Sequence, residues 1–81
     1  MPLRLDPSDT RPLPVQIAAA LRTQVAAGVL RPGEGVPSTR NLASQLGVSR
    51  GSVVTAYEQL TAEGYLTAEV GSGTVINPLL P

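Results

Sequence analysis

The sequence predicts a small, mostly α-helical domain in which three helices precede a single β-hairpin. Glycine and proline divide the 81 residues into short segments. Apolar residues recur at helical spacing in the first three of these segments and alternate with polar residues in the last. The core must be built from slender aliphatic side chains, because the chain has eleven Leu, nine Val and nine Ala but no Phe or Trp. A chain of this length holds one small domain.

The first helix is expected from Pro14 to Ala27. Proline is tolerated in the first turn of a helix, and the glycine that follows the segment, Gly28, is typical of a helix end. An apolar stripe recurs every four residues along the segment. It consists of Leu13, Ile17, Leu21 and Val25. Before the helix, residues 1–11 contain two prolines and several charges, so we expect an extended lead-in there.

A second, shorter helix is expected over Thr39–Leu46. The preceding segment, residues 31–35, contains one proline and two glycines and predicts a turn rather than a helix or a strand. Ser38 can accept a hydrogen bond from a free N–H group at the helix start. Gly47 suits the left-handed position that follows a helix end.

The third helix is expected to follow the Ser49 cap and to reach Glu63, so that residues 49–63 form one unit. Only three residues separate it from the second helix, which predicts a helix-turn-helix. Gly64 ends it. Its apolar stripe consists of Val53, Ala56, Tyr57 and Leu60.

A β-hairpin is expected over residues 66–76. Apolar and polar residues alternate from Leu66 to Val70, a turn follows over residues 71–73, and the chain returns from Thr74 to Ile76. The domain would then span residues 12–76. Residues 77–81 end in two leucines and a proline, so we interpret them as the start of a linker to a further domain outside this chain.

The composition argues against an enzyme. The chain has no Cys, His or Lys, which removes disulfides, the usual metal ligands, the commonest general base and any Schiff base with pyridoxal phosphate. Glu63 and Glu69 are the one carboxylate pair to consider, but no other catalytic group accompanies them. We therefore predict no catalytic residue and no metal site. Without a long apolar run or a signal peptide, no membrane partner and a cytoplasmic location are expected.

The charge distribution indicates where a helix-turn-helix would meet DNA, although six arginines balance six acidic residues. Such a motif offers its second helix to the major groove, N-terminal residues first. The N-terminal half of the exposed face of residues 49–63 is small and polar, and Glu58 lies in the C-terminal half. Arg40 and Arg50 lie in first helical turns, where the helix dipole disfavours cations unless phosphate is bound.

Each candidate also has a purely structural interpretation. The two arginines can be solvated surface residues, Ser38 and Ser49 can be simple helix caps, and the hairpin turn can be an ordinary loop. Tyr57 is expected in the core. The candidate DNA-binding residues are Ser38, Thr39, Arg40, Ser49, Arg50, Gly51, Ser52, Val54, Thr55, Gly71, Ser72, Gly73 and Thr74.

Several separated motifs together resemble the winged-helix domain of GntR-type bacterial regulators. The resemblance covers about residues 12–76. Residues 56–60, together with residues 63–65 and 71–74, are most similar to the MocR branch of that family. The motifs are Pro37–Ala43, Leu46–Val53, Glu63–Leu66 and Gly71–Val75.

This resemblance implies a winged helix-turn-helix in which residues 49–63 enter the major groove and residues 66–76 form a wing. The family's DNA-contacting arginines match Arg40 and Arg50, and the wing glycine matches Gly71. Many relatives carry a further arginine where this sequence has Val54. That departure leaves Arg50, Ser52, Thr55 and Val54, the last against a thymine methyl group, to read bases.

The resemblance further implies sequence-specific binding of double-stranded operator DNA in transcription regulation. In the MocR branch a linker joins this domain to a large domain that binds pyridoxal phosphate and makes the protein a homodimer. No cofactor is expected in this chain, and the isolated domain is expected to be monomeric or weakly dimeric. Two alternatives remain: a short regulator of the YtrA branch, and a winged helix that binds another protein through an exposed apolar patch.

Overall fold

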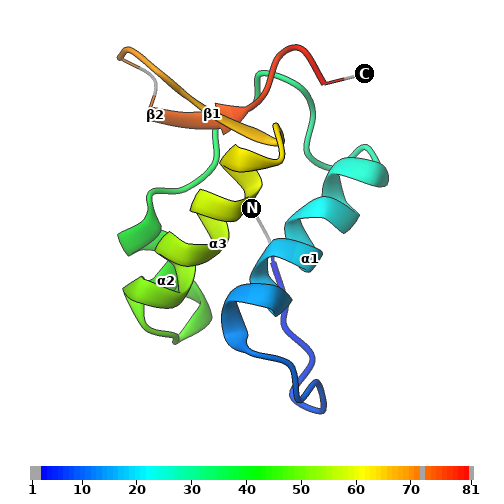
Figure 1. The fold of residues 1–81 in the computed structure, drawn as a ribbon, viewed down its shortest axis with the longest axis vertical. Coiled ribbons are helices and arrows are strands. Elements are labelled where there is room, and N and C mark those ends of the chain that lie inside the picture. Colours follow the sequence, from blue (N-terminus) through cyan, green and yellow to red (C-terminus); the bar gives the residue numbers. More distant parts are fainter. Residues whose placement is uncertain (1–2, 72, 81) are drawn as a thin grey trace.

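The computed structural model describes residues 3–71 and 73–80, and over these residues the chain forms three helices and a two-stranded antiparallel sheet (Figure 1). The predicted fold class is confirmed. The second helix has the predicted bounds, whereas the first begins and ends one residue earlier than expected. The elements are α1 Leu13–Ala26, α2 Thr39–Leu46, α3 Arg50–Ala62, β1 Leu66–Glu69 and β2 Gly73–Ile76.

The ends of α2 and α3 are set by the residues that the sequence indicated. The Ser38 hydroxyl oxygen accepts a hydrogen bond from the backbone N–H of Asn41, and Gly47 closes α2 at a φ of 68°. A residue with a side chain is strained at this φ, and glycine is not. Ser49 caps α3 in the same way by accepting from the backbone N–H of Ser52. A tight turn therefore joins the two helices.

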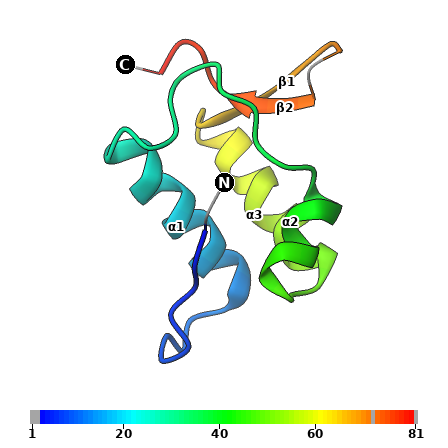
Figure 2. The same ribbon diagram turned by 180° about the vertical axis from the view of Figure 1, so that it is seen from behind.

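The core lies where α3 packs against α1, α2 and β1. Both views show α1 and α2 on opposite sides of α3, with the hairpin across one end of the helices (Figures 1 and 2). The predicted stripes of α1 and α3 supply six of the fourteen buried apolar side chains in the described part of the chain, whereas Leu13, at the start of the first stripe, stays 38% exposed. The largest fully buried side chains are Ile17, Leu21, Leu42, Val53, Leu60 and Ile76.

The segment before α2 pairs with β2, so the expectation of a turn without strand pairing is wrong. Gly33 N–H donates to the Ile76 carbonyl at 2.8 Å, and Ile76 N–H donates to the Glu34 carbonyl at 2.8 Å. A bridge between Gly35 and Val75 continues this pairing. Glycines give no β-strand signal in a sequence, but their main-chain groups pair as well as any others. β2 thus lies between β1 and this segment.

The hairpin register shifts the predicted turn by one residue. Glu69 pairs with Gly73, so Gly73 belongs to β2, while Val70 lies outside β1 and is fully exposed. Ser72, the centre of the predicted turn, lies outside the described residues. Leu66 pairs with Ile76 at the other end of the register, and both side chains are buried.

Two contacts between distant parts of the chain hold the helices in place. The lead-in packs against the core through Leu3, which is 9% exposed, and Gln16 donates to the carbonyls of Asp9 and Arg11. Arg22 of α1 forms a bidentate ion pair with Glu63 at the end of α3, in which Nε and Nη2 donate to the two carboxylate oxygens at 2.8 and 2.9 Å. Among the described residues, no helix is both long and apolar enough to cross a membrane.

Candidate nucleic-acid interface

The N-termini of α2 and α3 lie side by side. The Arg50 side chain donates a hydrogen bond from Nε to the Thr39 hydroxyl oxygen at 3.2 Å, which joins the first residues of the two helices. Neither helix has an acidic residue in its first turn. The positive ends of two helix dipoles therefore meet on one surface without a carboxylate to neutralise them.

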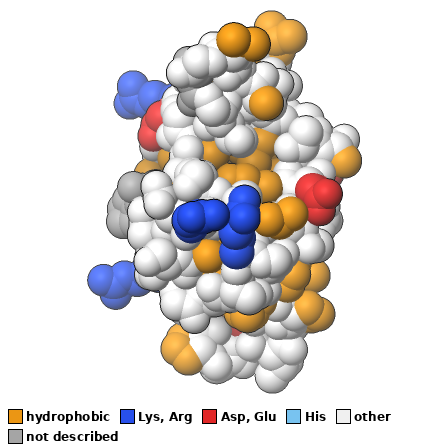
Figure 3. Space-filling view, turned by 90° about the vertical axis from the view of Figure 1, so that its left-hand side faces the viewer, with side chains coloured by type: hydrophobic (Ala, Val, Ile, Leu, Met, Phe, Trp, Pro, Cys, Tyr) orange, Lys and Arg blue, Asp and Glu red, His pale blue; other side chains and the backbone are white. Residues whose placement is uncertain are grey.

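Arg40 and Arg50 are the arginines of α2 and α3, and both are exposed. Among the residues that the structure describes, neither has an acidic group within ion-pair distance, whereas Arg11 is paired with Asp9 and Arg22 with Glu63. Figure 3 shows basic side chains gathered in the middle of the face on which α2 lies. The charge of this pair is thus available to an external anion.

The two cap serines are already engaged by the protein. Ser38 and Ser49 each accept the backbone hydrogen bond that begins their helix, and the Ser49 and Ser52 hydroxyl oxygens lie 2.8 Å apart. Their cap role is confirmed, and their contact with DNA stays a prediction. Gly51 and Thr55 are exposed on α3, and Ser52 is half-buried.

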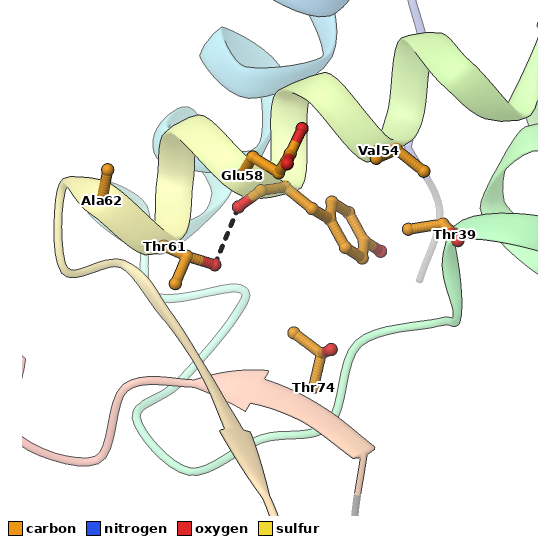
Figure 4. A pocket seen from close by; sticks show the side chains of 7 residues that line it. Thr39, Val54, Glu58, Thr61, Ala62 and Thr74 are labelled. Carbon is orange, nitrogen blue, oxygen red and sulfur yellow. Dashed lines mark hydrogen bonds between the residues drawn. The ribbon is translucent and has the colours of Figure 1, made fainter.

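A groove of about 470 Å³ separates α3 from β2. Figure 4 shows Val54, Glu58 and Ala62 along α3, with Thr39 at the start of α2 and Thr74 on β2 across the groove; in this view the Glu58 carboxylate points away from Thr74. Three candidates from three separate motifs, Thr39, Val54 and Thr74, therefore meet at one surface. The groove is lined by Thr39, Val54, Tyr57, Glu58, Thr61, Ala62 and Thr74.

The walls of this groove are mostly apolar. Two of its hydroxyl groups donate inside the protein: Tyr57 to the Pro37 carbonyl at 2.6 Å and Thr61 to the Tyr57 carbonyl at 2.8 Å. Burial raises the pKa of Tyr57 to about 12, so its phenol is neutral near pH 7. Glu58, which is exposed, contributes the one formal charge of the lining. Such a surface suits methyl groups and sugar rings more than a proton-transfer reaction.

The described residues at the tip of the hairpin are Val70, whose side chain is fully exposed, and two glycines. Gly71 and Gly73 are exposed and have φ values of 83° and 73°. The candidate between them, Ser72, lies outside the described residues. Thr74 is half-buried and faces the groove.

Sequence reasoning did not include Glu58, Thr61 or Ala62 among the candidates. The available signal was their spacing from Val54, because residues four, seven and eight positions apart share one face of a helix. None of the 81 residues is a lysine, so this chain has no side chain that could form a Schiff base with pyridoxal phosphate.

Comparison with known proteins identifies the domain. Residues 13–76 match the family described as "Bacterial regulatory proteins, gntR family". The chain is 54% identical over 78 residues to the "HTH-type pyridoxine biosynthesis transcriptional regulator PdxR" of Corynebacterium glutamicum, covering 96% of the chain and 17% of that relative. It is 43% identical over 79 residues to the "Probable rhizopine catabolism regulatory protein MocR" of Rhizobium meliloti, covering 98% of the chain and 16% of that relative.

Similarity to solved structures supports the assignment to this family. YtrA from Sulfolobus acidocaldarius, a GntR-family transcription factor, has a TM-score of 0.86 at 33% identity, covering 96% of this chain and 82% of that one. The DNA-binding domain of AraR in complex with operator ORX1 has a TM-score of 0.75 at 26% identity, and the match covers 91% of this chain and 92% of that one. The higher identity to PdxR and MocR favours the MocR branch over the short YtrA type. The chain belongs to the GntR family of bacterial regulatory proteins, as a winged-helix DNA-binding domain of a transcription regulator.

Proposed function

We propose that this domain reads double-stranded operator DNA by placing α3 in the major groove and the hairpin, residues 66–76, on the adjacent groove. The observation that carries the proposal is the exposed pair Arg40 and Arg50, which lies without acidic partners at two adjoining helix N-termini. Helix N-termini bind phosphate through free N–H groups and the dipole, and arginine adds charge and a two-pronged donor. The known AraR complex with operator DNA supports the same use of this fold.

Roles for single residues follow from their positions on this surface. Arg40 and Arg50 hold phosphate or guanine, and Ser52 and Thr55 lie close enough to the N-terminus of α3 to reach base edges. Val54 offers methyl groups to the methyl group of thymine. The remaining candidates contribute backbone or hydroxyl contacts to phosphate. They are Ser38, Thr39, Ser49, Gly51, Gly71, Ser72, Gly73 and Thr74.

We place the DNA-binding domain at residues 12–76, with residues 1–11 as its lead-in and residues 77–81 as the start of a linker. The chain spans about one sixth of the length of PdxR and of MocR. In this proposal a further domain follows, makes the protein a homodimer and carries any pyridoxal phosphate, and the protein acts in the cytoplasm. A formal net charge of zero predicts weak DNA binding by one isolated, monomeric domain.

Fluorescence-anisotropy titration tests this function. The probes are a duplex from the intergenic region upstream of the gene and a scrambled duplex of equal length, at about 50 and 200 mM salt. We expect tighter binding of the upstream duplex, and a loss of ~1–3 kcal/mol from Arg40→Ala and from Arg50→Ala. The matched control is Arg4→Ala, which removes the same charge from the lead-in.

Two results of these titrations would contradict the proposal. If wild type binds neither duplex at low salt, or if all three arginine variants behave alike, the proposed surface is not the DNA-binding surface. A protein-binding winged helix would then be the better interpretation. The exposed large apolar side chains give that interpretation little support, because they are divided among the start of α1, the turn after α1, the hairpin turn and the C-terminal tail. They are Leu13, Val15, Val29, Val70 and Leu79.

A further inference from the structure

The groove between α3 and β2 has a defined place on DNA if the proposed function holds, and this inference rests on that function. A helix in the major groove and a hairpin on the adjacent groove lie on either side of one sugar–phosphate strand. That strand separates the two grooves of the duplex, so it must pass between the two protein elements. In this protein, the groove lined by Val54, Glu58 and Thr74 lies between them (Figure 4).

Apart from the hydroxyl groups of Thr39 and Thr74, the lining of this groove is unsuited to attract phosphate. It contains no arginine, its walls are mostly apolar, and its one formal charge is the Glu58 carboxylate. A phosphate strand that crosses the groove therefore meets apolar walls and a negative charge.

Glu58 differs from most other acidic residues of the chain in having no partner. Asp9 and Glu63 are paired with arginines, Asp6 accepts from Ser8, and Glu34 accepts from the backbone of Arg31. Among the described residues, no cation or hydrogen-bond donor engages the Glu58 side chain, which is exposed on α3. Within the part of the chain that the structure describes, its charge is therefore not neutralised, and it acts directly on an anion that approaches the groove.

We propose that Glu58 sets the affinity of this domain by repelling the DNA backbone. The arginine pair attracts phosphate at the N-termini of α2 and α3, and Glu58, two turns further along α3, opposes the strand that crosses the groove. Because the backbone is the same in every sequence, the repulsion lowers affinity for operator and unrelated DNA by the same factor. A single domain is thereby kept weak, and firm operator binding requires two linked copies.

Anisotropy titrations of Glu58→Gln and Glu58→Ala test the proposal with the upstream duplex and a scrambled duplex. Both variants remove the charge, and neither disturbs a contact within the described structure. We expect each to bind both duplexes about 3- to 10-fold more tightly at ~50 mM salt, with a smaller gain at ~200 mM. Asp6→Asn is the matched control: it removes one charge from the lead-in and should leave affinity within about twofold.

Several results would overturn this inference, and they separate it from the proposed function. If the Glu58 variants bind like wild type while Arg50→Ala still weakens binding, the repulsion is absent and the DNA-binding surface stands. If Asp6→Asn gives the same gain, net charge rather than the position of Glu58 is responsible. If Glu58→Gln changes affinity only for duplexes with one particular base pair, Glu58 reads a base, such as the cytosine amino group. If no variant binds DNA, the proposed function fails as well.

Discussion

Gly51 lies in the first turn of α3, where its lack of a side chain has no explanation within the fold. An added Cβ would meet no atom within 4 Å, and the residue is exposed. Glycine in a helix is less stable than alanine by roughly 0.5–1 kcal/mol. In the proposed interface, the DNA backbone approaches this turn closely, and a residue without a side chain leaves room for it.

We therefore expect Gly51→Ala to separate stability from binding. Urea unfolding should show a gain of about 0.4–1 kcal/mol, because alanine restricts the unfolded chain and favours the helix. Anisotropy should show weaker binding of the upstream duplex, because the new methyl group stands where the backbone would approach. Unchanged affinity in the more stable variant would place Gly51 outside the interface.

Tyr57 joins the core to the segment before α2, and its ionisation is expected to lower the free energy of unfolding at alkaline pH. Its hydroxyl donates to the Pro37 carbonyl at 2.6 Å, and burial raises its pKa to about 12, against an ordinary value of about 10. The neutral phenol is thus favoured in the folded state. The stabilisation by the neutral Tyr57 side chain is complete below its ordinary pKa of ~10, and it is lost as pH rises towards the folded-state pKa of about 12.

Tyr57→Phe should lower stability near pH 7 by about 0.5–1.5 kcal/mol, the usual value of a lost hydrogen bond. It should also flatten the fall in unfolding free energy between pH ~10 and ~12, because phenylalanine does not titrate. Denaturant unfolding at a series of alkaline pH values measures both effects. An equally steep fall in the variant would mean that another group sets the alkaline limit.

At the scale of elements, the Arg22–Glu63 pair joins α1 to the end of α3. The Arg22 guanidinium hydrogen-bonds the carboxylate and holds the pKa of Glu63 below its ordinary value. The stabilisation is therefore present above the unfolded pKa of ~4.3 and is lost as pH falls through the lowered folded value. The pair is partly exposed, so its effect is small and screened by salt.

A double-mutant cycle with Arg22→Ala and Glu63→Gln isolates this pair from the other carboxylates. Thermal unfolding at neutral pH should show a favourable coupling between the two side chains that disappears in acid. The cycle is needed because Asp6 and Asp9 also have a lowered pKa, through Ser8 and Arg11. Coupling that is zero at neutral pH, or that persists unchanged in acid, would contradict the ion-pair interpretation.

The elements show which parts of the fold leave a signal in the sequence. The bounds of α2 were predicted because a serine cap and a left-handed glycine mark its ends chemically. The pairing of residues 33–36 with β2 was missed because main-chain hydrogen bonds made by glycines carry no side-chain signature. The Arg22–Glu63 pair was missed because periodicity reports neighbours along one helix, and these residues are 41 positions apart.

For the molecule as a whole, the candidate site was predicted as separate motifs and is assembled by packing. Charge at the N-termini of α2 and α3 is visible in the sequence, because caps and first turns are local features. The meeting of Thr39, Val54 and Thr74 at one groove depends on how the hairpin lies across the helices. Glu58 becomes part of the lining of this groove for the same reason, and so its proposed role became visible only in the structure.

Residues 77–80, which follow β2, leave the domain in a direction that their hydrogen bonds fix. This direction decides where a second, linked copy would be attached. Asn77 donates through its side chain to the Gly64 carbonyl at 2.9 Å and through its backbone to the Tyr65 carbonyl at 2.9 Å. The chain therefore exits beside the base of the hairpin (Figure 1). A linker that begins here starts at the C-terminal end of α3, on the side of the molecule away from α2.

Joining two copies after residue 80 through a flexible linker or a dimeric coiled coil should consequently raise affinity without any new protein–DNA contact. The second domain then binds at an effective concentration near millimolar, which can tighten binding by about 10²- to 10⁴-fold when both half-sites are reachable. Titration of the joined and single chains with the upstream duplex measures this gain. The same joined chain on a duplex cut to half its length is the control, because only one domain can engage there. An equal affinity of single and joined chains for the full duplex would show that operator binding does not depend on two copies, and the weakness of the single domain would need another cause.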